Sequence, residues 1–513
     1  MRVVTLPVTF RPPSDVPRPG PAVPAFAAAP VALVASVVAG LLAVTADGYG
    51  YHRDELYFRF LGFHPGWGYV DQPPGTPLLA RAAVEVFGDS VWGLRVPAVL
   101  AAVAVAVLLA LVAREAGAGR FGQSVAACGA AGTFVLLLGH VLLTASVDMV
   151  IWLAVLLFAL RALLRAEPRW WLAAGVAVGV GLWFKLLIVL LLAVLVAAVL
   201  VAGPRSALRS PWLWAGALAA LLIGLPNLVY QVANGFPQLA MADALRANKG
   251  AEARVLLAPF QFVVVGLPLV PVVVAGLVAL LRRPALRPVR ALALGYGLLL
   301  VVLFALAAQP YYTVGLVLAL YAIGARVVEG WATGAARRAV LAAALALNTI
   351  GAVAFALPVF PLSVQERIGV AEVNQGTRDQ IGWPAYTRQV ADVYAALPPP
   401  DAARAVIVTG NYGEHGAIHR YGPALGLPVD RLYSGQNELH RIAAPGEGGT
   451  VVVLVGLGED GSVMRTWFAS CETVARLDHG LDIANEEQGR PITVCRQPRQ
   501  PWSVLWQRFQ HYD

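Results

Sequence analysis

The chain has 513 residues, of which 58% are hydrophobic and only 13% charged, and it carries a formal net charge of +8. A soluble domain usually has about 25% charged residues, so the composition excludes an ordinary soluble enzyme. The apolar residues come in blocks of roughly 20, which is the length that crosses a bilayer as a helix. The basic residues lie mostly between these blocks, which is typical of cytoplasmic loops, so no nucleic-acid partner is expected.

The N-terminal segment differs in composition from the apolar blocks. Residues 1–25 are polar and rich in proline, with arginines at Arg2, Arg11 and Arg18. A cleaved signal peptide would show a short apolar core and a small-residue cleavage site, and this segment has neither. We therefore expect residues 1–25 to form a disordered cytoplasmic tail.

Apolar segments long enough to be membrane helices begin at residue 26. The stretch 170–203 is too long for one span and Lys185 interrupts it, so two short helices are expected to meet there. By length and apolarity the predicted spans, about eleven in all, are 26–45, 92–113, 122–143, 147–164, 170–185, 187–203, 211–230, 255–281, 291–308, 312–328 and 338–357.

The placement of arginine predicts the orientation of these spans. Counted from a cytoplasmic N-terminus, every second loop carries a cluster of arginines, whereas the loops between them carry most of the acidic residues. Arg and Lys are enriched in cytoplasmic loops. The sequence thus predicts a multi-pass protein of the cell membrane, with a membrane domain at 26–357, a long first outer loop at 46–90 and an extracytoplasmic C-terminus.

From residue 358 the chain becomes polar and alternates short β-like runs with helical stretches. This alternation predicts a small α/β domain at 358–513, outside the cytoplasm. The expected strands are 405–409, 450–455, 472–477, 491–495 and 502–507, and the expected helices are 384–397, 414–421 and 462–470. The predicted fold class is an α-helical polytopic membrane protein with a C-terminal extracytoplasmic α/β domain.

Three cysteines are present, and two of them fall in the predicted exported domain. An oxidising compartment and an even number favour a disulfide between Cys471 and Cys495. The alternative is a pair of free buried thiols. Cys128 lies within a predicted span, where it would serve as a small core residue.

The first outer loop opens with four ionisable residues in a row, His52, Arg53, Asp54 and Glu55. A carboxylate at a membrane boundary, partly shielded from water, can act as a general base. Neighbouring residues on a helix point in different directions, so at most one of Asp54 and Glu55 is expected to face a given substrate atom. The alternative is that both are ordinary carboxylates of a solvated loop.

Further candidate residues lie on the same predicted face of the membrane. Asp148 begins the fourth span, where it could complement the helix dipole or instead hold a cation or an acceptor hydroxyl. Lys185 could neutralise a phosphate as a point charge, or extend to the lipid headgroups. Arg246 and Lys249, in the predicted outer loop 231–254, could bind an anionic headgroup.

Tyr311 and Tyr312 could belong to an interfacial aromatic belt or line a cavity. The sequence contains no Gly-rich phosphate loop, no paired-cysteine or HExxH metal cluster and no serine nucleophile elbow. Their absence from the sequence argues against a nucleotide-driven pump. A phosphate-bearing substrate would therefore reach this protein already attached to a lipid.

Taken together, these residues resemble the GT-C superfamily of glycosyltransferases that use lipid-linked sugars. The chain looks most like glycosyltransferase family 39, the protein O-mannosyltransferases and lipid A aminoarabinose transferases. The resemblance covers roughly residues 26–330. It is carried by the Asp54–Glu55 pair and by the segments 71–78 (DQPPGTPL), 146–149 (SVDM), 179–185 (GVGLWFK) and 309–312 (QPYY).

This resemblance implies an inverting transfer of a sugar from a polyprenyl-phosphate donor to an acceptor on the outer face. Asp54 matches the proposed general base of the family, and Asp148 matches the second acidic residue of the site. The candidates for contact with the donor phosphate are Lys185, Tyr311, Arg246 and Lys249, and those for contact with substrate are Glu55, Gln72 and Tyr312. The expected partners are the donor, membrane lipid and a glycan, lipid or protein acceptor.

The chain departs from the family pattern in two places. The aminoarabinose transferases have Glu-Lys before the paired prolines, whereas this chain has Asp71 and Gln72. The missing lysine argues against that subgroup. Asp71 could help to bind a divalent metal ion, and no other cofactor is expected. The exported tail is not the MIR domain of protein mannosyltransferases, and we expect it to recognise the acceptor or cover the active site.

Two other classes of function fit parts of the sequence. A transporter or flippase of a lipid-linked or envelope substrate would use cavity carboxylates for proton coupling. The long first outer loop, the fused exported domain and the lack of an evident inverted repeat weigh against that class. A non-catalytic envelope scaffold would use the tail to bind a partner.

Overall fold

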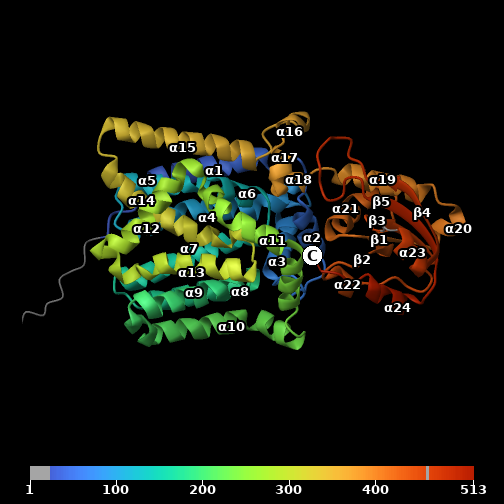
Figure 1. Ribbon diagram of the computed structural model, residues 1–513, viewed down its shortest axis with the longest axis horizontal. Helices are drawn as coiled ribbons and strands as arrows, with labels where there is room; N and C mark the ends of the chain where they lie inside the picture. Colours follow the sequence, from blue (N-terminus) through green and yellow to red (C-terminus); the bar gives the residue numbers. More distant parts are fainter. Residues whose placement is uncertain (1–22, 458–460, 513) are drawn as a thin grey trace, which may run out of the picture.

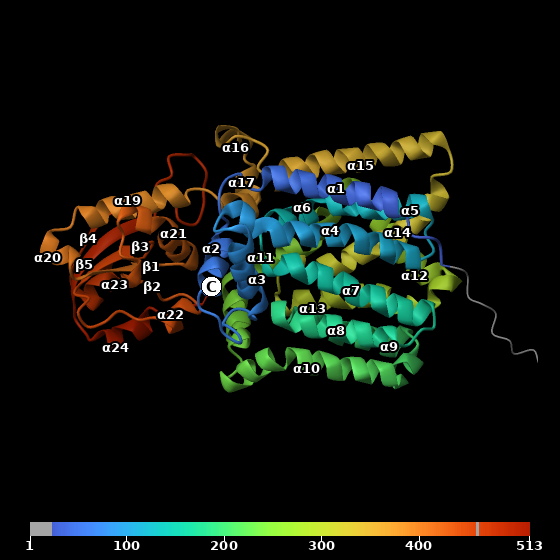
Figure 2. The ribbon, with the colours of Figure 1, turned by 180° about the vertical axis from the view of Figure 1, so that it is seen from behind.

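The structure of the protein is a computed structural model that describes residues 23–457 and 461–512. Residues 1–22 of the predicted cytoplasmic tail lie outside this range. Figures 1 and 2 show a bundle of long helices on one side, a smaller sheet domain on the other, and α2 and α3 at the junction. The first part contains α1 (Ala28–Thr45), α2 (Arg53–Gly62), α3 (Gly75–Phe87), α4 (Val91–Glu115), α5 (Arg120–Ala127), α6 (Thr133–His140), α7 (Thr144–Leu164), α8 (Trp170–Phe184), α9 (Leu187–Ala202), α10 (Pro211–Ala233), α11 (Pro237–Val265), α12 (Val270–Arg282), α13 (Ala291–Leu306), α14 (Val314–Trp331) and α15 (Ala335–Ala356).

Within the described ranges, six helices are long and apolar enough to cross a membrane, and two bent helix pairs bring the number to as many as eight. The bent pairs join α5 to α6 and α11 to α12. Three shorter apolar helices, α8, α9 and α13, coincide with further predicted spans. The prediction of a multi-pass helical membrane protein is confirmed, and the count of about eleven spans stays a prediction.

The break at Lys185 lies where the sequence places it. The helix α8 ends at Phe184, Lys185 has an extended backbone with φ −160° and ψ 126°, and α9 begins at Leu187. A lysine in the middle of a continuous span would have to bury its charge in hydrocarbon. Dividing the stretch brings Lys185 to the end of the bundle that adjoins the sheet domain.

Two predicted segments in the middle of the chain have a shape that the sequence analysis did not foresee. The predicted loop 231–254 is mostly helical, because α11 begins at Pro237 and continues through residues of high helix propensity. The predicted span 255–281 is not straight: it breaks at Gly266, where φ is +90° and the chain bends by 79°. A side chain at Gly266 would collide with Asn348 of α15, so packing between distant helices determines this bend.

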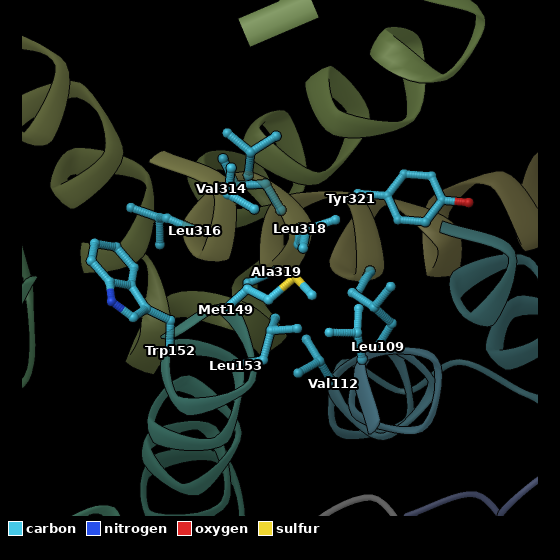
Figure 3. Close-up of a cluster of buried hydrophobic side chains, with 14 of the residues drawn as sticks. Leu109, Val112, Met149, Trp152, Leu153, Val314, Leu316, Leu318, Ala319 and Tyr321 are labelled. Atoms are coloured by element: carbon cyan, nitrogen blue, oxygen red, sulfur yellow. The ribbon is translucent and has the colours of Figure 1, made fainter. Parts of the chain in front are cut away.

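The core of the bundle lies where α4, α7 and α14 meet. Figure 3 shows Leu109 and Val112 of α4, Met149 and Leu153 of α7, and Leu318 of α14 gathered in one buried cluster. Every residue of α14 from Val314 to Ala325 is buried, as expected for a helix that is apolar on all sides. Because Met149 follows Asp148 directly, this core fixes the start of α7 and with it the Asp148 carboxylate.

Glycines allow two pairs of helices to approach very closely. Where α12 crosses α14, a side chain at Gly276 would collide with the Leu320 carbonyl, and one at Gly324 would collide with the Val272 carbonyl. Where α8 crosses α10, a side chain at Gly175 would collide with the backbone of Gly216, and one at Gly216 would collide with the Trp171 carbonyl. Close backbone contact between small residues is a common means of helix association in membranes, where apolar side chains gain little by leaving lipid.

The sheet domain follows α15 through three short helices at the junction. Its five strands have the order β2-β1-β3-β5-β4, with β1 parallel to β2 and β3, and β5 antiparallel to β3 and β4. The remaining elements are α16 (Leu362–Ile368), α17 (Val370–Val373), α18 (Gln375–Arg378), α19 (Trp383–Ala395), α20 (Pro399–Ala402), β1 (Ala405–Thr409), α21 (Tyr412–Tyr421), β2 (Leu432–Ser434), α22 (Leu439–Ile442), β3 (Val451–Val455), α23 (Gly461–Trp467), β4 (Phe468–Arg476), β5 (Pro491–Pro498) and α24 (Trp502–Leu505).

The predicted α/β character is confirmed, with one wrong strand. Residues 502–507 form α24 and a following 3-10 turn. Trp502, Leu505, Trp506 and Phe509 are all buried, and their spacing is that of one helical face. The short strand β2 was not predicted. Cys471 of β4 lies opposite Cys495 of β5, and the structure joins them in a disulfide.

Gly324→Ala should destabilise the bundle, because the added methyl group meets the Val272 carbonyl and neither backbone can move without repacking the core. Overpacking of this kind costs about 1–3 kcal/mol. The measurement is the thermal unfolding of the detergent-solubilised protein. Gly351→Ala on the exposed face of α15 is the matched control, since nothing lies within 4 Å of the added atom. Equal midpoints for the two variants would contradict this account of the crossing.

Candidate active site

The helix α2 carries the adjacent carboxylates and begins with a reciprocal cap. The Asp54 backbone N–H donates to His52 Nδ1 (3.1 Å), and the His52 backbone N–H donates to Glu55 Oε2 (2.8 Å). Asp54 and Glu55 both lie in the first turn, where negative charge is favoured by the helix dipole. Because they are successive residues on a helix, their side chains leave the axis in different directions.

Glu55 points into the protein core. Its side chain is fully buried and forms an ion pair with the fully buried Arg95, at 2.8 Å between Oε2 and the guanidinium. The Leu142 backbone N–H donates to its other oxygen (2.9 Å). Both oxygens of Glu55 are therefore occupied by the protein, which places this predicted substrate contact among the residues that hold the fold.

Asp54 lies at the junction between the bundle and the sheet domain and is only partly buried. Its Oδ1 accepts a hydrogen bond of 2.8 Å from the hydroxyl of Tyr412, the first residue of α21. The Tyr412 ring stacks on Tyr57 of α2, with 4.7 Å between ring centroids. The guanidinium of Arg53 lies 4.9 Å from the same ring. The sheet domain thus contributes a side chain directly to the candidate base.

A second carboxylate, Asp71, lies near the first. The Tyr57 hydroxyl donates to Asp71 Oδ1 (3.2 Å), and Glu438 is close enough for its charge to act on Asp71. Burial, together with the charges of Glu438 and Asp54, raises the pKa of Asp71 to about 7. Beside it, the amide oxygen of Gln72 is buried without a hydrogen-bond partner in the described structure.

The residues around Asp71 do not form a ligand set for the divalent ion that the sequence left open. Across residues 23–457 and 461–512, no group of three or more His, Cys, Asp or Glu side chains is placed to hold a metal ion. The atoms that surround Asp71 include the hydroxyl of Tyr57 and the amide of Gln72.

A third group forms where α7, the break at Lys185 and the start of α14 meet. Lys185 Nζ lies 3.3 Å from the Tyr311 hydroxyl and over the rings of Tyr311 and Tyr312, at 4.7 and 4.6 Å from their centroids. Asp148 and both tyrosines line a buried cavity of about 10 Å³, roughly the size of one water molecule. The charges of Asp54 and Asp148 both act on Tyr311, so this group and Asp54 belong to one electrostatic environment.

Arg246 and Lys249 lie on the first half of α11. This helix packs against the turn Pro310–Thr313, which carries Tyr311 and Tyr312. Arg246 is exposed and Lys249 half-buried. The two residues therefore lie on the helix that covers the tyrosine pair.

Sequence reasoning missed three contributors to the site. Tyr412, Tyr57 and Glu438 are brought to Asp54 and Asp71 by the docking of α21 and of the segment before α22 onto α2. The polar stretch 410–416 stands out within the tail, but its spacing in the sequence does not indicate which helix it meets. The only local indication of a special role is that Tyr412 lies between Asn411 and Gly413 at the start of a helix.

The start of α21 is held by a buried carboxylate. Glu414 Oε2 accepts the backbone N–H groups of Gly410 (2.8 Å) and Asn411 (3.2 Å), and the Asn411 side chain accepts the Glu414 N–H in return. Burial, with the nearby charge of Glu487, raises the pKa of Glu414 to about 8. This cap fixes the position of Tyr412, which lies between Asn411 and Glu414 in the chain.

Comparison with known proteins gives matches of two kinds. A family model described as dolichyl-phosphate-mannose-protein mannosyltransferase matches residues 71–230. No curated protein matches the chain. The fold is similar to that of ArnT from Cupriavidus metallidurans in the apo state, with 16% identity, a TM-score of 0.57, and coverage of 90% of this chain and 97% of that one.

Two further structures share the fold. ArnT from Cupriavidus metallidurans bound to undecaprenyl phosphate is 17% identical, with a TM-score of 0.55 and the same coverage of 90% and 97%. The archaeal oligosaccharyltransferase AglB from Archaeoglobus fulgidus, in complex with an inhibitory peptide and a dolichol-phosphate, is 14% identical. Its TM-score is 0.50, over 85% of this chain and 70% of that chain. The family model falls within residues 26–330, which carry the resemblance stated from the sequence, and the solved structures show that the fold is shared.

The stability of the protein should fall as the pH rises from about 4.3 to about 8 and level off above that, because of Glu414. In an unfolded chain a glutamate has a pKa of about 4.3, whereas burial raises the pKa of Glu414 to about 8 in the fold. Folding therefore favours the protonated form, and that stabilisation is complete below the unfolded pKa and lost as the pH passes the folded one. The measurement is the thermal midpoint from pH 5 to pH 9, and Glu414→Gln should flatten its decline.

The matched control for this pH series is Glu472→Gln, which replaces an exposed glutamate on β4. It should reproduce the pH dependence of the unchanged protein. If Glu414→Gln declines as steeply as this control, Glu414 is not the titrating group.

Proposed function

We propose that this membrane glycosyltransferase transfers a sugar from a polyprenyl-phosphate donor to an acceptor hydroxyl, with inversion at the anomeric carbon and with Asp54 as the general base. The observation that carries the proposal is the contrast between two adjacent carboxylates. Both oxygens of Glu55 are engaged by the protein, through the ion pair with Arg95 and hydrogen bonds from backbone N–H groups. Asp54 uses Oδ1 for Tyr412, and its Oδ2 accepts no hydrogen bond from the described residues.

The reaction is a single displacement. The acceptor oxygen attacks the anomeric carbon while its proton passes to Asp54 Oδ2, and the bond between that carbon and the phosphate oxygen breaks. The leaving oxygen keeps the electron pair, so polyprenyl phosphate departs with one more negative charge. Attack opposite the leaving group inverts the configuration. A positioned base of this kind contributes about 10²–10⁴-fold to the rate.

Lys185 and Tyr311 are the groups that would stabilise the departing phosphate. The Lys185 ammonium lies over the two tyrosine rings and within 3.3 Å of the Tyr311 hydroxyl. Positive charge held in place before the reaction stabilises charge that develops in the transition state. Asp148 lies close enough for its charge to interact with Lys185, and so would hold the ammonium at the site.

The remaining predicted residues take supporting roles in this proposal. Gln72 has a buried amide oxygen that could accept a hydrogen bond from a sugar hydroxyl. Tyr312 forms part of the wall around the cavity. Arg246 and Lys249, on the helix that covers the tyrosine pair, would meet the anionic headgroup as it approaches through the membrane.

The proposed location of the reaction is the extracytoplasmic face. The arginine clusters of alternate loops support a cytoplasmic N-terminus and an exported sheet domain. The disulfide between Cys471 and Cys495 supports the same orientation, because disulfides persist in oxidising compartments. A donor carried by a lipid remains available there, where nucleotide sugars are absent.

Replacing the proposed base should abolish transfer without loss of the protein. Asp54→Asn keeps the size of the side chain and removes its ability to take a proton, so product formation should fall by at least about 100-fold. A strain that lacks the protein is complemented with each variant, and its lipid-linked sugars and envelope glycans are compared by mass spectrometry. The donor should accumulate with Asp54→Asn and be consumed with Asp47→Asn, an exposed carboxylate before α2. Normal product with Asp54→Asn would remove Asp54 from the role of base.

The orientation is tested with single cysteines at two exposed serines. Ser503→Cys lies in the sheet domain, and Ser206→Cys lies beside Arg205 in a turn between α9 and α10. A membrane-impermeant maleimide added to intact cells should label the first and not the second. Labelling of Ser206→Cys in intact cells would reverse the proposed topology.

A further inference from the structure

We infer that Tyr412 is a positioning residue for Asp54, so that the C-terminal domain completes the active site of the membrane domain. This inference rests on the proposed function, because it assigns Tyr412 a role through the base. The contact that carries it is the hydrogen bond of 2.8 Å from the Tyr412 hydroxyl to Asp54 Oδ1. It joins residues that lie 358 positions apart in the chain.

The position of Tyr412 is fixed by contacts with three residues from two parts of the chain. Its backbone N–H donates to the Gln436 side chain (2.7 Å), which follows β2. Its ring stacks on Tyr57 and lies against the guanidinium of Arg53, both from α2. A hydroxyl held in this way has few other orientations, which is the requirement for a group that orients another.

The docking of α21 onto α2 leaves little freedom for relative movement. A side chain at Gly413 would collide with Trp383 and crowd Arg53, and one at Gly416 would collide with Leu56. These two glycines, three residues apart on one face of α21, allow the helix to lie directly against α2. Arg53 adds an ion pair with Glu486 from the segment before β5. Tyr412 therefore keeps its distance to Asp54 as long as the two domains are docked.

The loop before Tyr412 is tied to the last described residues of the chain. His511 Nε2 lies 2.9 Å from the Gly410 carbonyl, and the His511 carbonyl accepts the Asn437 N–H (3.0 Å). His511 thereby ties the end of the described chain to the loops at Gly410 and Asn437. Figures 1 and 2 show the helix α21, which follows Gly410, facing α2. The segment that presents Tyr412 is thus held at both its ends.

This arrangement divides the two oxygens of Asp54 between two tasks. Tyr412 occupies Oδ1 and so fixes the plane of the carboxylate about its bond to Cβ. The other oxygen, Oδ2, then points in one direction and is available to take the acceptor proton. Without the tyrosine hydroxyl the carboxylate can rotate and only part of its population has the productive geometry, which lowers the rate of the chemical step rather than binding.

The experiment compares Tyr412→Phe with Tyr421→Phe. The first keeps the ring that stacks on Tyr57 and removes only the hydroxyl. The second removes a hydroxyl at the opposite end of the same helix, where the ring lies 6.4 Å from that of Tyr51. Each variant is purified in detergent and added to washed membranes from a strain that lacks the protein. These membranes supply the accumulated donor and the acceptor. Initial rates are measured against the amount of membrane extract, to separate the maximal rate from the half-saturating amount.

Tyr412→Phe should lower the maximal rate by about tenfold or more, as expected for a hydrogen bond to a charged group, with the half-saturating amount changed less than about twofold. Tyr421→Phe should leave both values unchanged. Thermal unfolding of both variants is measured in parallel. A maximal rate equal to or above that of the unchanged protein would overturn the inference, and so would a loss of rate matched by a lower unfolding temperature.

Asp54→Asn in the same assay separates this inference from the proposed function. If Asp54→Asn is inactive and Tyr412→Phe is fully active, the base stands and the positioning role fails. If Asp54→Asn is active, the proposed function fails, and any loss with Tyr412→Phe has another cause.

Discussion

The buried ion pair between Glu55 and Arg95 is the interaction on which the arrangement of the site depends. Both side chains are fully buried, and Arg95 also donates to the backbone carbonyls of Ala46 and Gly50 and to the side chain of Gln380. The pair thereby links the end of α1, the start of α2, α4 and the segment that leads into the sheet domain. Removing one partner of such a pair leaves an uncompensated charge and costs about 3–5 kcal/mol.

The same pair explains how two adjacent carboxylates have different tasks. One residue step around a helix turns the side chain by about 100°. With Glu55 directed at Arg95, Asp54 is directed at the junction with the sheet domain, where Tyr412 meets it. The fold thus uses one carboxylate to hold the start of α2 and presents the next to the junction. The sequence of an Asp-Glu pair does not show which carboxylate forms the buried ion pair and which faces the junction, because either residue could do either.

Much of the fold could be predicted because hydropathy is a local property. The spans, the interruption at Lys185 and the buried strands at 405–409 and 451–455 each have their signal within a few residues. Some failures occur where the determinant is distant. A side chain at Gly266, where the chain bends, would collide with the distant Asn348. Tyr412 belongs to the same class, since its partner lies on α2. The wrong strand at 502–507 is a different case, because the helical spacing of Trp502, Leu505, Trp506 and Phe509 is present in the sequence itself.

The separation between Asp54 and Tyr412 has a consequence for the order of biosynthesis. The Glu55–Arg95 pair spans 40 positions and can form while most of the chain is still being made, whereas the contact with Tyr412 spans 358. Translation adds about 5–20 residues per second, so tens of seconds separate the two events. During that interval the membrane helices can insert and pack while Asp54 still lacks its partner. With the positioning role proposed for Tyr412, an assembling chain reaches its full rate only after the sheet domain has docked on α2.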